Sequence, residues 1–464
     1  MHRRTLMKLG AVSALLAAVP GAAALAAGSR QPFVRDDIGQ LRKVLINSPS
    51  LDDYTIDRLS EGLLPWFGRD IETAVKEHRS MVELLQTSGA ELIELQDVLQ
   101  SAINSARERG AFGAWLSAAH PRLYPEADRV SAATLLGRDP AFQFRRHEDG
   151  SYRHTASAIS SSIWTRDPSF MTPQGLVIGG ASTVFRAREN VLLRFVMKFA
   201  PEMADIPVVF DGDMEGFLVE GGDAQMLDEK TLLLGVGQQS DARTAAVLAR
   251  RLDMDVVAVR IHDEEFIKRE RSYSWGPLGS LRLLVLHLDT FFTHVNRQHA
   301  LSVPWLLEQE HAGKDPLSQY LRGARIDTEV DPGLVEQALK FLEGFGQVQV
   351  HAAGTGKPVE MDEMKLVDYV REKGYRITWV GGQGLEDSDA GFRHFMRHTL
   401  RELRNQAANV VATAPGQVIA YGGNPLTQSA LEGDGIQVAS FATTELVRGS
   451  GGPHCLTMPL MRNG

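Results

Sequence analysis

Hydrophobic positions follow two different periods along most of the chain, and the two periods alternate. Short apolar runs at 41–49 (LRKVLINSP) and 91–95 (ELIEL) predict β-strands, and the amphipathic stretch at 70–90 between them predicts a helix. Beyond residue 160, further runs that predict strands lie at 175–180, 216–223, 231–237, 255–261, 281–289, 409–423 and 436–441. Stretches with helical spacing lie among them at 241–252, 331–346 and 390–408. This alternation predicts an α/β protein.

Two stretches fit the alternation poorly. Residues 97–150 are polar, with helical spacing and no strand pattern, so we expect an inserted helical subdomain there. Residues 294–331 are expected to form a helical or loop excursion over one face. The phosphate-binding patterns GxGxxG and GxxxxGK do not occur in the sequence, which removes the main support for a nucleotide-binding fold. Strand and helix units repeated around one axis stay open as an arrangement.

Composition and charge narrow the possible partners. The 464 residues are 43% hydrophobic and 23% charged, which is typical of a globular protein with a large core. The length alone suggests two or three units, which repeats could join into one. The net charge is −9, and the sequence has no basic stripe, so we expect no nucleic-acid partner.

The first residues carry the features of an export signal. Arg3 and Arg4 precede a weakly hydrophobic, alanine-rich stretch that ends in a small-x-small pattern at 24–26. The arginine pair is typical of the twin-arginine route, which predicts a periplasmic or secreted protein. A membrane anchor is the alternative, but Pro20 and the low hydrophobicity disfavour a spanning helix, so we expect no membrane contact after cleavage. Residues 1–30 are therefore assigned to a signal peptide.

Cys455 is the only cysteine in the chain. Because it has no partner within the chain, an intramolecular disulfide and a cysteine-pair metal site are both excluded. Inert packing, an intermolecular crosslink and a nucleophilic role remain. The segment RGSGGPHC (448–455) favours the nucleophile, because its glycines and proline allow a close backbone approach and it places His454 beside the thiol.

Acidic residues and one histidine interrupt apolar runs at three further places. The segment WTRDPSF contains Asp167, FLVEGGD contains Glu220 and Asp223, and LLVLHLD contains His287 and Asp289. Strand alternation predicts that the last two share a face. Each place has a plainer explanation: a turn before proline, a solvated bulge, and a satisfied core pair. Because charge is costly to bury, the set together indicates a functional site.

A thiol, a histidine and several carboxylates suit a planar cation as substrate. Carboxylates hold a guanidinium group through charge-assisted, coplanar hydrogen bonds and keep its carbon electrophilic. A thiolate can then attack that carbon. These residues therefore predict a small guanidino compound as the substrate.

Four motifs resemble, in the same order, those of arginine deiminases and the wider guanidine-modifying superfamily. They are TRDPS, EGGD, HLDT and GGPHCLTMPL, supported near the start by LRKVLINSP. The resemblance covers roughly residues 38–462 and implies a pentein fold, a propeller-like ring of five ββαβ units around the active site. Arginine deiminases carry a helical insertion after the first unit, and residues 97–150 would supply it. The catalytic domain would then comprise residues 31–96 and 151–464.

The resemblance also implies a role for each motif residue. Cys455 corresponds to the nucleophile and His287 to the general acid and base. Asp167 and Asp289 correspond to the carboxylates that clamp the guanidinium group, and Glu220 corresponds to the carboxylate beside the histidine. Losing His287 should nearly silence turnover, since a general acid or base typically supplies ~10² to 10⁴ in rate.

The implied reaction is a hydrolysis through a covalent amidino thioether on Cys455, with release of ammonia and a ureido product. Asp223, which closes the EGGD motif, is expected at the substrate. The reaction implies no metal and no organic cofactor. An amidinotransferase with the same intermediate and a guanidino-binding protein without turnover stay open, as does the oligomeric state.

The chain departs from the family where family members hold the amino-acid end of free arginine with several arginines. Gln239 and Ser450 stand at two of those places. A third corresponds to Arg188 or Arg186, and Arg448 lies two residues before Ser450. Glutamine and serine supply no charge, so the resemblance transfers the guanidinium chemistry but leaves open whether L-arginine is the substrate. Arg448 or Arg243 could take over this role and restore arginine binding.

Overall fold

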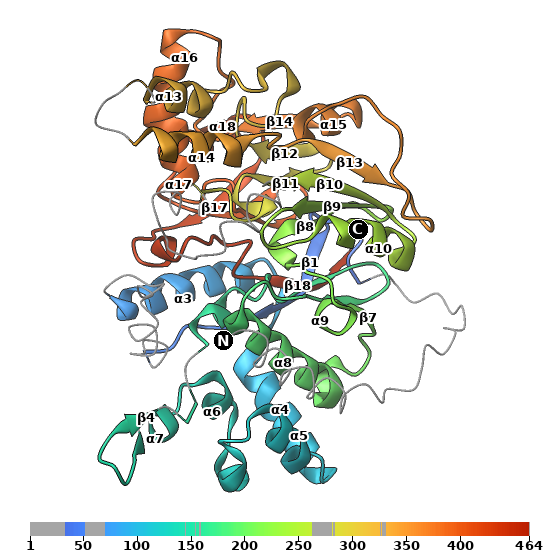
Figure 1. Cartoon of the computed structure of the whole chain (residues 1–464), viewed down its shortest axis with the longest axis vertical. Helices are drawn as coiled ribbons and strands as arrows, with labels where there is room; N and C mark the ends of the chain where they lie inside the picture. Colours follow the sequence, from blue (N-terminus) through green and yellow to red (C-terminus); the bar gives the residue numbers. More distant parts are fainter. Residues whose placement is uncertain are drawn as a thin grey trace.

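The computed structural model describes residues 33–51, 70–143, 145–153, 155–156, 159–261, 281, 284–324, 326 and 331–463. Residues 1–30, assigned above to the signal peptide, lie outside this part. Helices and strands alternate along the described chain (Figure 1), so the prediction of an α/β protein is confirmed. Within these ranges, no helix is both long and apolar enough to cross a membrane.

Sixteen strands form the main sheets in the described part of the chain. They are β1 (Gln40–Ile46), β2 (Glu91–Glu94), β5 (Ser169–Met171), β6 (Leu176–Ile178), β7 (Val208–Asp211), β8 (Ala224–Asp228), β9 (Thr231–Val236), β10 (Asp255–Arg260), β11 (Phe292–Asn296), β12 (His299–Ser302), β13 (Val348–His351), β14 (Arg376–Trp379), β15 (Val411–Ala414), β16 (Gln417–Tyr421), β17 (Gln437–Phe441) and β18 (Met458–Asn463). Two further short strands, β3 (Arg145–Arg146) and β4 (Tyr152–Arg153), pair with each other.

Helices connect and cover these strands. The α-helices are α3 (Ile71–Thr87), α4 (Leu95–Glu108), α5 (Phe112–Ala119), α6 (Ala132–Leu136), α7 (Pro140–Gln143), α8 (Val184–Phe199), α9 (Gly212–Glu215), α10 (Ala242–Leu252), α13 (Pro316–Ala324), α14 (Pro332–Leu342), α15 (Leu366–Glu372), α16 (Asp389–His394), α17 (Leu400–Arg404) and α18 (Pro425–Gly433). The short 3₁₀ turns are η2 (Tyr124–Arg129), η3 (Ser160–Ile163), η4 (Pro201–Met203), η5 (Gly221–Asp223), η6 (Leu288–Thr290), η7 (Gln309–His311) and η9 (Leu446–Gly449), and η8 (Phe395–Thr399) is a π-helical turn.

One strand pattern recurs in the sheets. Two antiparallel strands are followed by at least one helix and by a third strand parallel to the second, as in β5, β6, α8 and β7. The same order holds for β8, β9 and β10, for β11, β12 and β14, and for β15, β16 and β17. In the remaining sheet, β18 takes the place of the first strand and pairs antiparallel with β1. Figure 1 shows these two strands, red and blue, side by side.

Local sequence explains the regular elements. In α10, the buried residues Ala245, Leu248, Ala249 and Leu252 recur at helical spacing, and Asp241 caps the first turn by accepting from the backbone N–H of Arg243 at 2.8 Å. Strand β9 is buried along its whole length, so its sequence is apolar without alternation.

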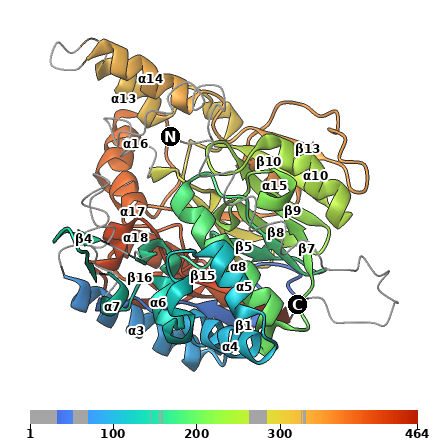
Figure 2. The ribbon, with the colours of Figure 1, turned by 60° about the horizontal axis from the view of Figure 1, so that its bottom comes forward.

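The segment expected to be a helical insertion contains helices that pack on α8. Trp115 of α5 lies against Phe195 of α8, with ring centroids 4.0 Å apart, and both belong to one core with Leu99 of α4. Figures 1 and 2 show α4 to α7 gathered at one end of the molecule. The helices therefore share a hydrophobic core with α8 and the strands beside it. The segment is not purely helical, because it contains β3, which pairs with β4 just beyond the predicted end at residue 150.

The prediction of a strand at 216–223 is wrong for its last residues. Only Val219 pairs, in an isolated bridge, and Glu220 leads directly into η5. Gly221 explains the bend, because a Cβ atom there would lie 2.0 Å from the backbone oxygen of Arg166. The chain therefore turns against a neighbouring loop and leaves the sheet.

The strand predicted at 281–289 is also wrong, as far as this run is described. His287 lies in a bend and Asp289 in η6. The backbone N–H of Leu288 donates to Asp223 Oδ1 at 3.1 Å and makes no ladder with another strand. The expectation that His287 and Asp289 share a face of one strand therefore fails.

The excursion expected at 294–331 begins later than predicted. Strand β12 lies within it, paired with β11 on one side and with β14 on the other. A buried histidine hid the strand pattern: His299 is 2% exposed and hydrogen-bonds through Nε2 to Thr378 Oγ1 at 2.7 Å. The helical and loop part of this segment follows β12.

Candidate active site

Cys455 lies in the loop between η9 and β18, and its thiol contacts Asp289. The Sγ–H group donates to Asp289 Oδ2 at 3.2 Å, and His454 Nδ1 lies 2.8 Å from the same oxygen. The glycine before this turn is necessary, because a Cβ atom on Gly451 would lie 2.1 Å from Trp164 Nε1. The glycine-rich loop therefore allows Cys455 to contact the HLDT segment.

Asn409, at the start of the β15 hairpin, holds the cysteine loop and was missed by the sequence analysis. Its Nδ2 group donates to Cys455 Sγ at 3.1 Å and to the backbone oxygen of Asp289 at 3.0 Å. Its Oδ1 atom accepts from the backbone N–H groups of Cys455 and Gly452, both at 3.1 Å. The side chain is fully buried. Since asparagine before a strand is usual in turns, no local pattern marks this residue.

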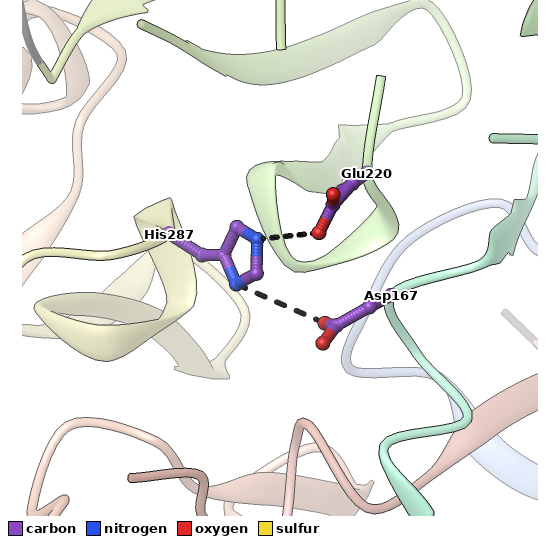
Figure 3. Close-up of side chains that lie close together, drawn as sticks. All are labelled: Asp167, Glu220 and His287. Atoms are coloured by element: carbon purple, nitrogen blue, oxygen red, sulfur yellow. Dashed lines mark hydrogen bonds and ion pairs between the residues drawn. The ribbon is translucent and has the colours of Figure 1, made fainter. Parts of the chain in front are cut away.

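His287 lies between two carboxylates, one from the turn before β5 and one from the residue that precedes η5 (Figure 3). Its Nε2 atom lies 3.1 Å from Glu220 Oε2, and its Nδ1 atom lies 3.8 Å from Asp167 Oδ1. All three residues are at most 3% exposed. We call Asp167, Glu220, Asp223 and Asp289 the acidic cluster.

Asp223 holds the segment that carries His287. It accepts from Ser240 Oγ at 2.6 Å and from the backbone N–H of Leu288 at 3.1 Å. Burial raises the pKa of Asp223 to about 7. Gly222 makes room for the ring, since a Cβ atom there would lie 2.7 Å from His287 Nδ1. The EGGD motif therefore both positions the histidine and leaves space for it.

Burial and the acidic cluster shift the pKa values of the Cys455 thiol and the His287 imidazole. Burial raises the pKa of the Cys455 thiol well above its ordinary value, and the charges of Asp289 and Asp167 raise it further, while the Asn409 N–H group acts against them. Burial alone would lower the pKa of His287, but its neighbouring carboxylates raise it to about 10. At neutral pH the thiol is therefore protonated and the imidazole is a cation.

A guanidinium group of the protein already lies in the acidic cluster. Arg186 of α8 pairs through Nη2 with Asp167 Oδ2, and its Nε atom lies 4.0 Å from Glu220 Oε2. Its Nη1 atom pairs with Glu189 Oε2 at 3.1 Å. The cluster is therefore able to hold a guanidinium group by charge and by hydrogen bonds.

Two oxygens of the acidic cluster are buried and accept no hydrogen bond from the described residues. They are Asp167 Oδ1 and Asp289 Oδ1, one from each of the carboxylates expected to clamp the substrate. A buried acceptor without a donor costs about 1–3 kcal/mol. Each oxygen is thus available to an N–H donor brought by a ligand.

The same geometry could be considered for a metal ion. Oxygens of Asp167 and Glu220 and a ring nitrogen of His287 lie within 4.8 Å of one another. With a pKa of about 10, however, His287 carries a proton on both nitrogens at neutral pH, so a metal ion would have to displace a proton to bind it. These residues suit an N–H donor cation better than a metal ion.

Two of the residues expected at the far end of the substrate lie at the acidic cluster. Gln239 Oε1 is hydrogen-bonded to Ser182 Oγ, and that hydroxyl also lies 3.2 Å from Glu220 Oε1. Arg186 is the second, as described above. The chain thus joins Gln239 to the carboxylate beside the histidine through one serine.

The other two expected residues, Arg188 and Arg448, lie on different elements, Arg188 on α8 and Arg448 on η9. Arg188, two residues along α8, is close to His120, where burial and the Arg188 charge lower the pKa of the histidine to about 4. Arg448 lies on η9, and its Nε atom is 3.8 Å from Glu445 Oε1.

Comparison with known proteins gives consistent matches along the chain. The family model for arginine deiminase matches residues 129–343 and 394–462. An arginine deiminase of Listeria monocytogenes serotype 4a (strain HCC23) is 26% identical over 462 residues, covering 92% of this chain and 97% of the relative. An arginine deiminase of Borrelia duttonii (strain Ly) is 24% identical over 456 residues, with the same two coverages.

Solved structures with a similar chain path are also found. DDAH from Pseudomonas aeruginosa in complex with citrulline is 13% identical, with a TM-score of 0.45, over 90% of this chain and 99% of that chain. The N-terminal domain of ArgZ bound to product, described as an arginine dihydrolase, is 15% identical, with a TM-score of 0.46, over 92% and 98%. The family model spans more than half of the chain, and its match includes the four motifs with Asp167, Glu220, His287 and Cys455. The chain therefore belongs to the arginine deiminase family, and the predicted family is confirmed.

Proposed function

We propose that this protein hydrolyses the guanidino group of a small molecule to a ureido group and ammonia, through a covalent intermediate on Cys455. Membership of the arginine deiminase family supports a hydrolase acting on guanidino groups. The observation that carries the proposal is the pair of buried acceptors without donors, Asp167 Oδ1 and Asp289 Oδ1, in a cluster whose Asp289 also contacts the thiol. A guanidinium group that donates to both oxygens would bring its carbon to the sulfur.

Arg186 and the substrate can use different oxygens of Asp167. Arg186 pairs with Oδ2, whereas Oδ1 accepts no hydrogen bond from the described residues and is the oxygen offered to the ligand. Arg186 also pairs with Glu189 at 3.1 Å, so its charge is held beside the site while the substrate binds.

The cation of the substrate also activates the thiol. A guanidinium group between Asp167 and Asp289 offsets the two charges that raise the pKa of Cys455. The thiol proton passes to Asp289 Oδ2, the acceptor that it already contacts at 3.2 Å. The thiolate then attacks the guanidinium carbon, and Asn409 Nδ2 stabilises the charge on sulfur.

His287 supplies the proton for the leaving group. As an imidazolium ion, it protonates one nitrogen of the tetrahedral adduct, and ammonia leaves to give the amidino thioether. The neutral imidazole then takes a proton from water, and the resulting hydroxide adds to the same carbon. Sulfur leaves as the thiolate and takes back the proton held by Asp289. The hydroxyl proton of the adduct passes to the released ammonia, which leaves a neutral ureido product and ammonium. Glu220 holds the ring through Nε2 throughout.

The proposal extends to architecture and location. We infer that the five recurring sheets form a pentein ring around the site, to which the glycine loop, η5 and η6 each contribute. We also infer export by the twin-arginine route from Arg3 and Arg4, followed by removal of about residues 1–30. Mass spectrometry of the mature protein from cells carrying Arg3 and Arg4 or two lysines would test the export proposal.

The catalytic proposal is tested by incubating the protein with a panel of guanidino compounds. Ammonia and the product mass are measured, together with any adduct on Cys455. We expect ammonia release that is lost in Cys455→Ser and falls at least ~10²-fold in His287→Ala. His351→Ala, a half-buried histidine on β13, serves as the matched control and should retain activity.

The outcomes separate the possible functions. Near-normal ammonia release by His287→Ala would refute the assigned general acid. Transfer of the amidino group to added glycine or lysine, in place of ammonia release, would make the protein an amidinotransferase. Binding without either product would make it a guanidino-binding protein.

A further inference from the structure

A cavity of about 310 Å³ borders the loop that carries Cys455. Its walls include Leu284, Arg404, Gln406, Val447, Arg448 and Ser450. Two of its described lining residues are arginines and none is acidic. Its charge is thus opposite to that of the acidic cluster.

Three links connect this cavity to the acidic cluster. Ser450 is followed by Gly451, whose ideal Cβ position lies 3.2 Å from Cys455 Cβ. Because consecutive Cα atoms are about 3.8 Å apart, Ser450 Cα lies within roughly 9 Å of that atom. The backbone oxygen of Gln406 accepts from the N–H of Asn409, which holds the thiol. Leu284, three residues before His287, supplies the third link.

The two arginines are placed to meet a ligand from outside. Arg404, at the end of α17, is exposed, and the Arg448 side chain is 56% exposed on η9. Guanidinium groups recognise carboxylates with paired hydrogen bonds, so this wall suits an anion.

We propose that the cavity binds the distal end of the substrate and that Arg404 and Arg448 recognise a carboxylate there. This inference rests on the proposed function, because the acidic cluster must hold the guanidinium end of the same molecule. None of the described lining residues is a carboxylate that could pair with an α-ammonium group, and the two arginines repel one. The substrate is therefore a short ω-guanidino acid whose far end has a net negative charge, such as an Nα-acylated arginine or a guanidino acid without an α-amino group.

The arrangement also accounts for the departures noted in the sequence. Gln239 and Ser450 remove charge where the family places arginines, and Gln239 is committed to Ser182 beside the acidic cluster. Arg404 and Arg448 supply positive charge in the cavity that Ser450 also lines. The positive charge for the distal end of the substrate is thus carried by other residues of this chain.

The test compares three substrates that differ only at the distal end: Nα-acetyl-arginine, L-arginine and agmatine. We expect kcat/KM to fall in that order. Arg404→Gln and Arg448→Gln should each raise KM for Nα-acetyl-arginine about tenfold, with little change in kcat and none for agmatine. Arg397→Gln, an exposed arginine on η8 outside the cavity wall, is the matched control.

A second readout keeps the test independent of turnover. The affinity of Cys455→Ser for Nα-acetyl-arginine, measured by calorimetry, should fall at least tenfold when both Arg404 and Arg448 are also replaced by glutamine. Agmatine as the best substrate, or equal KM changes for all three compounds, would overturn the inference while leaving hydrolysis intact. Absence of ammonia from every guanidino compound would instead overturn the proposed function.

Discussion

Asn409 offers the sharpest test of how the nucleophile is held. We predict that Asn409→Asp raises the pKa of the Cys455 thiol and slows hydrolysis. The aspartate keeps an oxygen for the backbone N–H groups of Cys455 and Gly452, but it cannot donate to Sγ while it is ionised. The substitution therefore removes both donations by this side chain, to Sγ and to the backbone oxygen of Asp289, and leaves most of its shape.

The magnitude follows from the lost hydrogen bond. A hydrogen bond to a charged group contributes about 1.5–3 kcal/mol, and one pKa unit corresponds to about 1.4 kcal/mol. Loss of the N–H donor should therefore raise the thiol pKa by about 1–2 units, and an added negative charge raises it further. Below that pKa, the thiolate fraction and kcat should each fall about 10–100-fold.

Alkylation by iodoacetamide as a function of pH measures this shift directly. Cys455 is the only cysteine, so the modified fraction found by mass spectrometry reports on one thiol. The control is Asn424→Asp, which replaces a buried amide that donates to the backbone oxygen of Asn405 at 3.1 Å and not to the thiol. If folded Asn409→Asp has the same alkylation profile as the wild type, Asn409 does not tune the nucleophile.

His287 should also make stability depend on alkaline pH. Its pKa is raised from 6.5 to about 10, so its stabilising contribution is complete below pH 6.5 and is lost as the pH rises through 10. Urea unfolding should show a loss on the order of 5 kcal/mol across this window, and a smaller loss in His287→Gln; a flat wild-type profile would contradict the shift. Gly222→Ala places a Cβ atom 2.7 Å from His287 Nδ1 and 3.0 Å from Asp167 Oδ1, so ammonia release should fall ~10²-fold. Gly433→Ala, with no atom within 4 Å of the added group, should retain activity, and equal activities of the two variants would count against a positioning role for Gly222.

The sequence predicted the central strands well and the functional segments poorly. Strands β9 and β10 are covered on both faces, so their apolar runs stand out between turn residues. The runs that end in EGGD and HLDT are equally apolar, yet they bend into η5 and η6. The hydrophobicity of a run predicts that the run is buried. It does not distinguish a buried strand from a buried segment that bends into a 3₁₀ turn.

The candidate site shows the same limit at the level of side chains. Residue types indicated Cys455, His287 and the carboxylates, because each is costly to bury without a purpose. Asn409 carries no such signal, and its contact with Cys455 joins positions 46 apart in the chain. The position of Arg186 inside the acidic cluster likewise depends on how α8 packs, which no local period encodes.

The pairing of β18 with β1 ties reactivity to the completeness of folding. The cysteine loop is anchored on one side by β18, whose register runs from Leu45 opposite Met458 to Gln40 opposite Asn463. Contacts this distant in the chain form slowly, because a very long loop has to close first. Partly folded molecules would therefore lack an aligned nucleophile, so enzymatic activity itself would measure how many chains have reached the native state.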